Sequence, residues 1–132
     1  MKINYFLTLP IFVLFTLSIM SANAYSLPAI EFEDAPFKAY YGTWSLGWEF
    51  NVIQSITVTG LGFYDDKGDG LKENHDVGIF NNKGELLVSG TVFANDPLLG
   101  FFRYTVVTPI VLSIGNDYRI AAANGSEYYT YI

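Results

Sequence analysis

After residue 43 the chain is a series of short apolar and β-branched segments, and the first of them, residues 44–50, alternates with the period of a β-strand. In the first such segment one face carries Trp44, Leu46, Trp48 and Phe50, and the other carries Ser45, Gly47 and Glu49. Further apolar and β-branched runs, separated by Gly, Asn, Asp and Pro, span residues 56–64, 76–80, 86–93, 101–107, 110–113 and 118–123. No helical period is visible after residue 30. The pattern predicts an all-β protein, an antiparallel β-sandwich of jelly-roll-like form.

The two tryptophans of the first segment have two interpretations. Trp44 and Trp48 are in phase with the other apolar residues of their strand face, and large apolar side chains usually lie inside a protein. The pattern therefore favours a place in the core. The alternative is a platform of exposed rings that stacks on sugars, to which Tyr40 and Tyr41 would also contribute.

Turns and chain ends set the expected limits of the domain. Residues 81–84, Asn-Asn-Lys-Gly, lie between two predicted strands and predict a hairpin turn. Residues 25–43 contain two prolines and are expected to form an extended lead-in to a domain of residues 44–132. The last run, 127–132, stops without a closing turn, and we expect it to be an unpaired strand. It is either a natural sheet edge or the end of a shortened domain that is incomplete at its C-terminus.

The first 24 residues have the parts of a secretory signal. Lys2 precedes an apolar run from Tyr5 to Met20, and the small residues Ala22 and Ala24 stand at the −3 and −1 positions of a cleavage site. We expect a signal helix that is cleaved after Ala24, which makes the protein secreted or extracytoplasmic. The run is short for a membrane anchor, which needs about 20 apolar residues, so no membrane span is expected after cleavage.

Charge and cysteine content narrow the classes of partner. Without Lys2, six basic residues face thirteen acidic ones, so the net charge changes from −6 to −7. An acidic chain with scattered basic residues repels phosphate backbones, and we expect no nucleic-acid partner. The chain has no cysteine. An exported domain of this size often depends on disulfides, so stability must come from the apolar core or from a bound ion.

Five carboxylates and the single histidine gather in residues 65–76, between two predicted strands. Calcium prefers several oxygen ligands on a loop in which Gly permits a tight turn. The candidate ligands are Asp65, Asp69 and Asp76, with Gly68 and Gly70 shaping the loop. Lys67 occupies a position where the calcium-loop template expects an oxygen ligand, and the flanks are strands, which excludes a helix–loop–helix site. The alternative is a solvated acidic turn, so no cofactor is assigned with certainty and calcium is the candidate.

Two further residues of this region are expected to have structural roles. His75 has no cysteine, serine elbow or second histidine with which to form a catalytic or zinc site, so we expect it to be hydrogen-bonded and to anchor the loop. Arg103 is a charge within an aromatic strand, and we expect it to pair with a carboxylate of the 65–76 segment. The sequence therefore predicts no catalytic residues, and it does not identify a ligand-binding site.

Several short motifs recur together in the order of a known family. They are Leu46-Gly47-Trp48-Glu49-Phe50, Leu61-Gly62, Gly68-Asp69-Gly70-Leu71, His75-Asp76-Val77-Gly78-Ile79, Pro97-Leu98, Phe102-Arg103-Tyr104, Pro109, Leu112, and Gly115 with Tyr118. The chain resembles an uncharacterised bacterial domain of secreted proteins, many of the PEP-CTERM type that exosortase sorts. The resemblance covers about residues 44–123 and implies export, a β-sandwich and a surface or extracellular-matrix role. Such relatives continue into further strands and often a Pro-Glu-Pro tail. This chain shows neither, so the resemblance does not extend to exosortase sorting.

Three functional hypotheses follow, in order of preference. The first is an exported, non-enzymatic module with a structural, adhesive or extracellular-matrix role, steadied by calcium if the 65–76 loop binds it. Its partners would be extracellular polysaccharide or cell-surface components. The second is a carbohydrate-binding module with exposed aromatic rings. The third is a hydrolase that uses His75 and neighbouring carboxylates.

Overall fold

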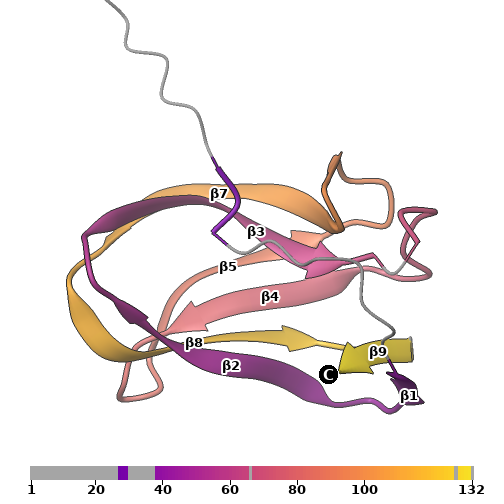
Figure 1. Ribbon diagram of the computed structural model, residues 1–132, viewed down its shortest axis with the longest axis horizontal. Helices are drawn as coiled ribbons and strands as arrows, with labels where there is room; N and C mark the ends of the chain where they lie inside the picture. Colours follow the sequence, from indigo (N-terminus) through magenta and orange to yellow (C-terminus); the bar gives the residue numbers. More distant parts are fainter. Residues whose placement is uncertain (1–26, 30–37, 66, 127, 132) are drawn as a thin grey trace, which may run out of the picture.

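The computed structural model describes residues 27–29, 38–65, 67–126 and 128–131 (Figure 1). The predicted signal helix at 1–24 lies outside the described residues. Within them the chain forms nine strands: β1 (Lys38–Tyr41), β2 (Ser45–Val52), β3 (Ile56–Tyr64), β4 (His75–Phe80), β5 (Leu86–Val92), β6 (Leu98–Leu99), β7 (Phe102–Leu112), β8 (Gly115–Ala123) and β9 (Tyr128–Tyr131). None of the described residues is helical, and none forms a helix that could span a membrane.

The strands pair antiparallel in a nested order. The first pairs with the last, β1 with β9, and inside this pair follow β2 with β8 and β3 with β7. The hairpin β4–β5 lies innermost, and β4 also pairs with β8. This produces a four-stranded sheet, β2-β8-β4-β5, and a three-stranded sheet, β3-β7-β6. A two-stranded ribbon folded over on itself in this way is a jelly-roll-like sandwich, and the all-β antiparallel prediction is confirmed.

The last strand is paired, which corrects the expectation of a free edge. Strand β9 aligns with β1, with Lys38 opposite Tyr131 and Tyr41 opposite Tyr128. The partner strand lies in the segment that the sequence indicated as an extended lead-in. Pairing between the two ends of a chain leaves no local signal, because the residues that meet are about ninety positions apart.

The core lies between the two sheets, where β3 and β7 pack against β4 and β5. Its buried apolar residues are Val52, Leu61, Leu71, Val77, Ile79, Val88, Val92, Val107 and Leu112. Each such side chain contributes about 1.5–3 kcal/mol when it is buried. The close approach of the sheets requires Gly90, since a Cβ there would lie 2.9 Å from the side chains of both Thr105 and Val107.

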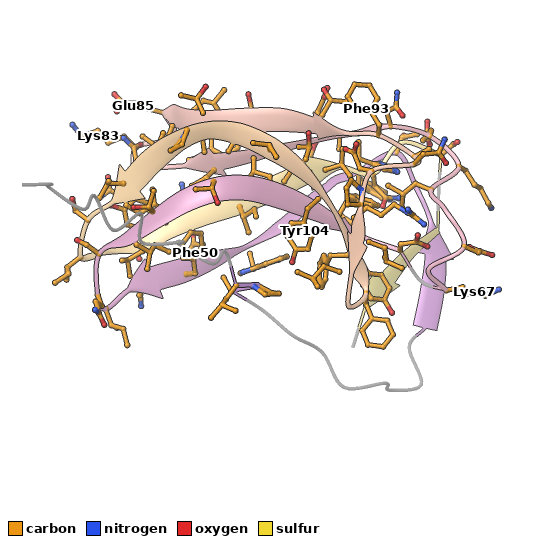
Figure 2. The ribbon with its side chains drawn as sticks, turned by 90° about the horizontal axis from the view of Figure 1, so that it is seen from above. Phe50, Lys67, Lys83, Glu85, Phe93 and Tyr104 are labelled. Carbon is orange, nitrogen blue, oxygen red and sulfur yellow. The ribbon has the colours of Figure 1, made fainter. Side chains whose placement is uncertain are left out.

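Turns at the two ends of the sandwich follow local sequence rules. At one end the predicted hairpin turn is present: the Asn81 carbonyl accepts from Gly84 N–H at 3.0 Å, and Gly84 has φ +82°. The Asn81 side chain accepts from the backbone N–H groups of Lys83 and Glu85, both at 2.9 Å. The loop of residues 65–76 lies at the opposite end, where Figure 2 shows Lys67.

Candidate functional site

Strand β2 is the edge of the wider sheet and extends beyond the cover of the narrower one. Its neighbour is β8, and among the described elements it packs extensively against β8 alone. In Figure 1 it forms the lower border of the molecule, with β8, β4 and β5 above it in turn. Along the described part of β2, burial is confined to the end of the strand at Phe50 and Val52.

Exposure along this face changes from one end of the strand to the other. Trp44, Leu46 and Trp48 are 59%, 36% and 44% exposed, whereas Phe50 is half-buried and Val52 is 5% exposed. The core position predicted for the two tryptophans is therefore wrong. Alternation showed correctly which residues share a face, but it does not show whether the opposite sheet covers that face. We refer to Trp44, Leu46 and Trp48 as the tryptophan strip.

Neighbouring groups hold Trp44 in place. The side chain of Asn124, which is buried at the end of β8, donates to the Gly42 carbonyl at 3.2 Å. Its backbone N–H donates to the Trp44 carbonyl at 2.8 Å. The indole lies across Gly42, because a Cβ built on that glycine would be 1.8 Å from the indole Nε1. The Trp44 indole can therefore occupy this position only because residue 42 is a glycine.

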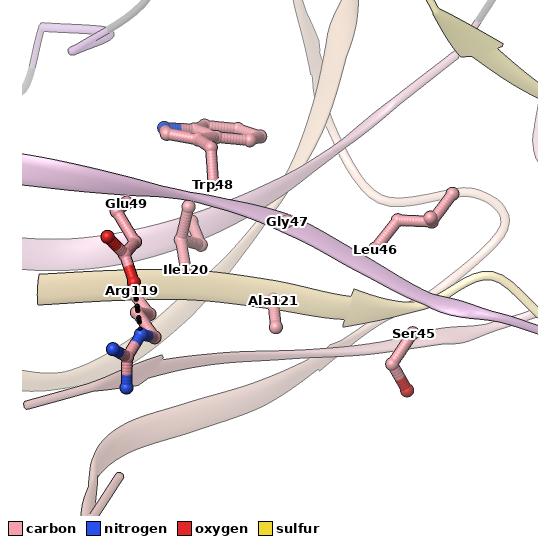
Figure 3. Close-up of a pocket in the computed structure, with 8 residues that line it drawn as sticks. All are labelled: Ser45, Leu46, Gly47, Trp48, Glu49, Arg119, Ile120 and Ala121. Atoms are coloured by element: carbon pink, nitrogen blue, oxygen red, sulfur yellow. Dashed lines mark hydrogen bonds and ion pairs between the residues drawn. The ribbon is translucent and has the colours of Figure 1, made fainter. Parts of the chain in front are cut away.

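The opposite face of β2 is polar. Arg119 Nε lies 2.7 Å from Glu49 Oε1 in an exposed ion pair across β2 and β8. Figure 3 shows this pair on one side of β2 and the Trp48 indole on the other, around a shallow hollow lined by residues 45–49 and 119–121. Gly47 lies against β8 so closely that a Cβ there would be 1.9 Å from the Ile120 carbonyl oxygen. Strand β2 therefore presents an uncharged aromatic face and a charged face.

The 65–76 loop is organised around a buried ion pair. Arg103 Nε lies 2.7 Å from Asp65 Oδ2, and the carboxylate side chain is 2% exposed. The same Asp65 oxygen accepts the Gly70 N–H at 3.0 Å, while Arg103 donates to the carbonyls of Asp96 at 2.8 Å and Gly68 at 3.3 Å. The predicted pairing of Arg103 with a carboxylate of this segment is confirmed. Gly68 and Gly70 have φ +66° and +110°, which side chains disfavour.

Other residues tie this loop to its surroundings. Leu71 is buried and its N–H donates to the Ala94 carbonyl, and the Asn74 side chain accepts from the Ala94 N–H at 3.2 Å. Glu73 accepts from both the backbone N–H and the hydroxyl of Ser126. The loop is thus fixed to two other segments of the chain.

His75 lies in the protein interior. Its side chain is fully buried, its Nδ1 lies 2.9 Å from the Ala123 carbonyl oxygen, and its ring stacks on Phe63 with 3.7 Å between ring centroids. The hydrogen bond links the start of β4 to the end of β8. A buried ring in this position joins strands, whereas a general base must reach the proton that it removes.

The three candidate calcium ligands have different surroundings in the structure. Asp65 faces Arg103, Asp76 on β4 accepts from the Thr91 hydroxyl at 2.7 Å, and Asp69 is exposed. Among the residues that the structure describes, no three His, Asp or Glu side chains are grouped so as to hold an ion. The positive charge beside Asp65 is a guanidinium. A role for calcium in this loop stays a prediction.

The model of a family described as a domain of unknown function, DUF4082, matches residues 33–132, which is most of the chain. The chain belongs to this family. No curated protein and no solved structure matches it.

Within this DUF4082 domain, sequence reasoning missed the residues that position Trp44 and the 65–76 loop. Gly42, Glu73 and Asn124 belong to no motif that indicates a contact, and their partners are distant in the chain. Asn124 directly precedes a glycine in a turn, which is the usual context of an asparagine with only local hydrogen bonds. Its burial could not be read from that context.

Proposed function

We propose that this chain is an exported, non-catalytic module that adheres to polysaccharide or to cell-surface components outside the cytoplasm. The observation that carries the proposal is the exposure of Trp48 on the edge strand β2 and of Trp44 directly before that strand. Contiguous apolar patches on a protein surface often mark interaction sites, and the tryptophan strip, with Leu46 between the two indoles, is such a patch.

The non-catalytic part of the proposal is supported by what the reactive groups contact. The Asp65 carboxylate pairs with Arg103, and the His75 ring is stacked and hydrogen-bonded inside the protein. These contacts give both groups structural roles. They weigh against the hydrolase alternative, which needs His75 at a surface that a substrate can reach.

The extracytoplasmic part rests on the sequence. Residues 1–24 have the order of a signal peptide, with Lys2, an apolar run and the small residues Ala22 and Ala24 before the expected cleavage site. The resemblance to domains of PEP-CTERM proteins suggests the same location. The adhesive role does not depend on calcium in the 65–76 loop, which is tested separately by its effect on the melting temperature.

The test is adhesion of the chain itself. The full chain is produced in a bacterial host, recovered from the extracytoplasmic fraction, and incubated with polysaccharide-rich matrix and with cell envelopes. We expect it to sediment with one of these, and the double variant W44A/W48A to stay in solution. Phe93→Ala is the matched control, because Phe93 is an exposed aromatic residue (53%) that is not part of the strip. Equal sedimentation of the double variant and the parent chain would rule out adhesion through β2.

A further inference from the structure

The tryptophan strip is linear and one strand wide. Trp44 and Trp48 are four positions apart on one face, which places their attachment points about 13 Å apart at a rise of roughly 3.3 Å per residue. Leu46 lies between them. The attachment points of both rings therefore follow the direction of β2, and a partner that runs along this strand passes them in succession.

The area of the strip fits a thin partner. An aromatic side chain offers roughly 150–250 Å², and these two are about half exposed, so with Leu46 the strip offers on the order of 300 Å². A stable protein–protein interface buries about 800 Å² on each partner. The strip alone is too small to hold a second protein. A polysaccharide chain is one sugar ring wide and needs only successive stacking positions.

The charge of the strip indicates which polysaccharides would bind. From Trp44 to Phe50 the residues on this face are uncharged, and so are Tyr118, Ile120 and Ala122, which lie beside them on β8. The charged pair Glu49–Arg119 lies on the other face (Figure 3). The chain as a whole carries a net charge of −6 and repels anionic polymers at a distance. An uncharged polysaccharide suits both the strip and the whole molecule.

The strip is also held in place before any partner binds. Asn124 fixes the backbone at residues 42 and 44, and the missing side chain of Gly42 leaves the space that the Trp44 indole occupies. Trp48 stands opposite Ile120 in the β2–β8 register. A preformed surface loses less conformational entropy on binding, which raises its affinity.

We propose that Trp44, Leu46 and Trp48 form a stacking platform for a single chain of an uncharged polysaccharide, with the two indoles contacting the C–H faces of two sugar rings. This inference rests on the proposed adhesive function and names its ligand class. Gly42 is a positioning residue in this platform, since it determines where the Trp44 ring lies.

The two strip indoles are the only tryptophans of the chain, so its tryptophan fluorescence reports on the strip alone. The test titrates the exported full chain with hydroxyethyl cellulose, mixed-linkage β-glucan and galactomannan, and with anionic alginate as a comparison. We expect a saturable change in emission with at least one uncharged polymer and none with alginate. A flat signal with all the uncharged polymers, or a stronger response to alginate, overturns the inference.

Variants separate stacking from general loss of structure, and their binding is measured by electrophoresis through gels that contain the polymer. W44A and W48A should each weaken binding about tenfold, which corresponds to roughly 1.4 kcal/mol, and Gly42→Ala should weaken it while both indoles remain. Phe93→Ala should bind as the parent does. Unchanged melting temperatures establish that the strip variants are folded. Binding that survives W44A/W48A overturns the inference.

The remaining outcomes distinguish this inference from the proposed function. If the strip variants lose adhesion to matrix while no uncharged polymer binds, the ligand class is wrong and the adhesive function stands. If the parent chain sediments with neither matrix nor cell envelopes, the proposed function itself fails. If the strip variants sediment as well as the parent chain does, adhesion stands and this inference about the strip fails. Analytical ultracentrifugation tests the remaining occupant, a second copy of the chain. A dimer of the parent chain that dissociates in the W48A variant would assign the strip to a second copy and would overturn the proposal of a polysaccharide ligand.

Discussion

Arg103 on β7 reaches Asp65 at the end of β3, 38 positions earlier in the chain, with 2.7 Å between Nε and Oδ2. The pair is largely removed from solvent, with side-chain exposures of 13% and 2%. Two further guanidinium hydrogen bonds, to the carbonyls of Asp96 and Gly68, connect the loops on either side. The Arg103 side chain thus joins its own strand, the 65–76 loop and the segment at Asp96 at one end of the sandwich.

Removing Arg103 should therefore destabilise the domain strongly. Arg103→Met leaves the Asp65 carboxylate buried without its counter-charge, which costs about 3–5 kcal/mol. Urea unfolding should show this loss, and Arg119→Met should change stability by less than about 1 kcal/mol because its pair with Glu49 is exposed. In Asp65→Asn/Arg103→Met the loss should be smaller than the sum of the single losses. Additive losses would contradict the coupling.

The close approach of β2 and β8 at Gly47 leads to a second prediction. Gly47→Ala places a methyl group 1.9 Å from the Ile120 carbonyl oxygen and 2.8 Å from the Ala121 Cα, so the strands must separate. We expect a loss of about 1–3 kcal/mol in the free energy of unfolding. Ser45→Ala, on the same face of the same strand, is the control and should change little. A Gly47→Ala variant as stable as the parent would show that β2 can shift without loss.

Two variants of His75 separate the stability that comes from its ring stacking from the stability that comes from its hydrogen bond. His75→Phe keeps a ring on Phe63 but loses the hydrogen bond to Ala123, and should cost about 1–3 kcal/mol. His75→Ala also leaves a cavity and should cost about 3–5 kcal/mol. Thermal unfolding followed by circular dichroism measures both. Equal losses in the two variants would mean that the stacked ring contributes nothing.

Calcium is tested by melting the protein with a chelator and then with millimolar calcium. We expect less than 1 °C between the two melting temperatures, about the limit set by a few tenths of a kcal/mol in a domain of this size. The reason is that Arg103 already supplies the positive charge at Asp65 and Thr91 donates to Asp76. A rise of several degrees would show that calcium stabilises the domain, and Asp69→Asn would then show whether the loop holds the ion.

Much of the fold was predictable because its signals are local. The alternation of residues 44–50 identified a strand and its two faces, and the Asn-Asn-Lys-Gly turn identified a hairpin, since backbone geometry sets both within a few residues. The same holds for the chemistry of Arg103. A charge in an aromatic strand needs a partner, and the 65–76 segment holds five of the thirteen carboxylates, the densest group in the chain.

Only the tertiary structure shows whether a strand face is covered, because the cover comes from the opposite sheet. The sequence by itself determined that Trp44 and Trp48 share a face, that the chain is all-β, and where most of the strands lie. It missed β1 in the expected lead-in, and it divided β7 at Pro109 into two runs. The nested pairing put β2 at an edge that β3 and β7 do not reach, so the tryptophans face solvent. It also joined β9 to β1 and placed Asn124 beside Gly42. Such contacts depend on how distant segments pack, because the free energy that selects them comes from burial across the whole domain.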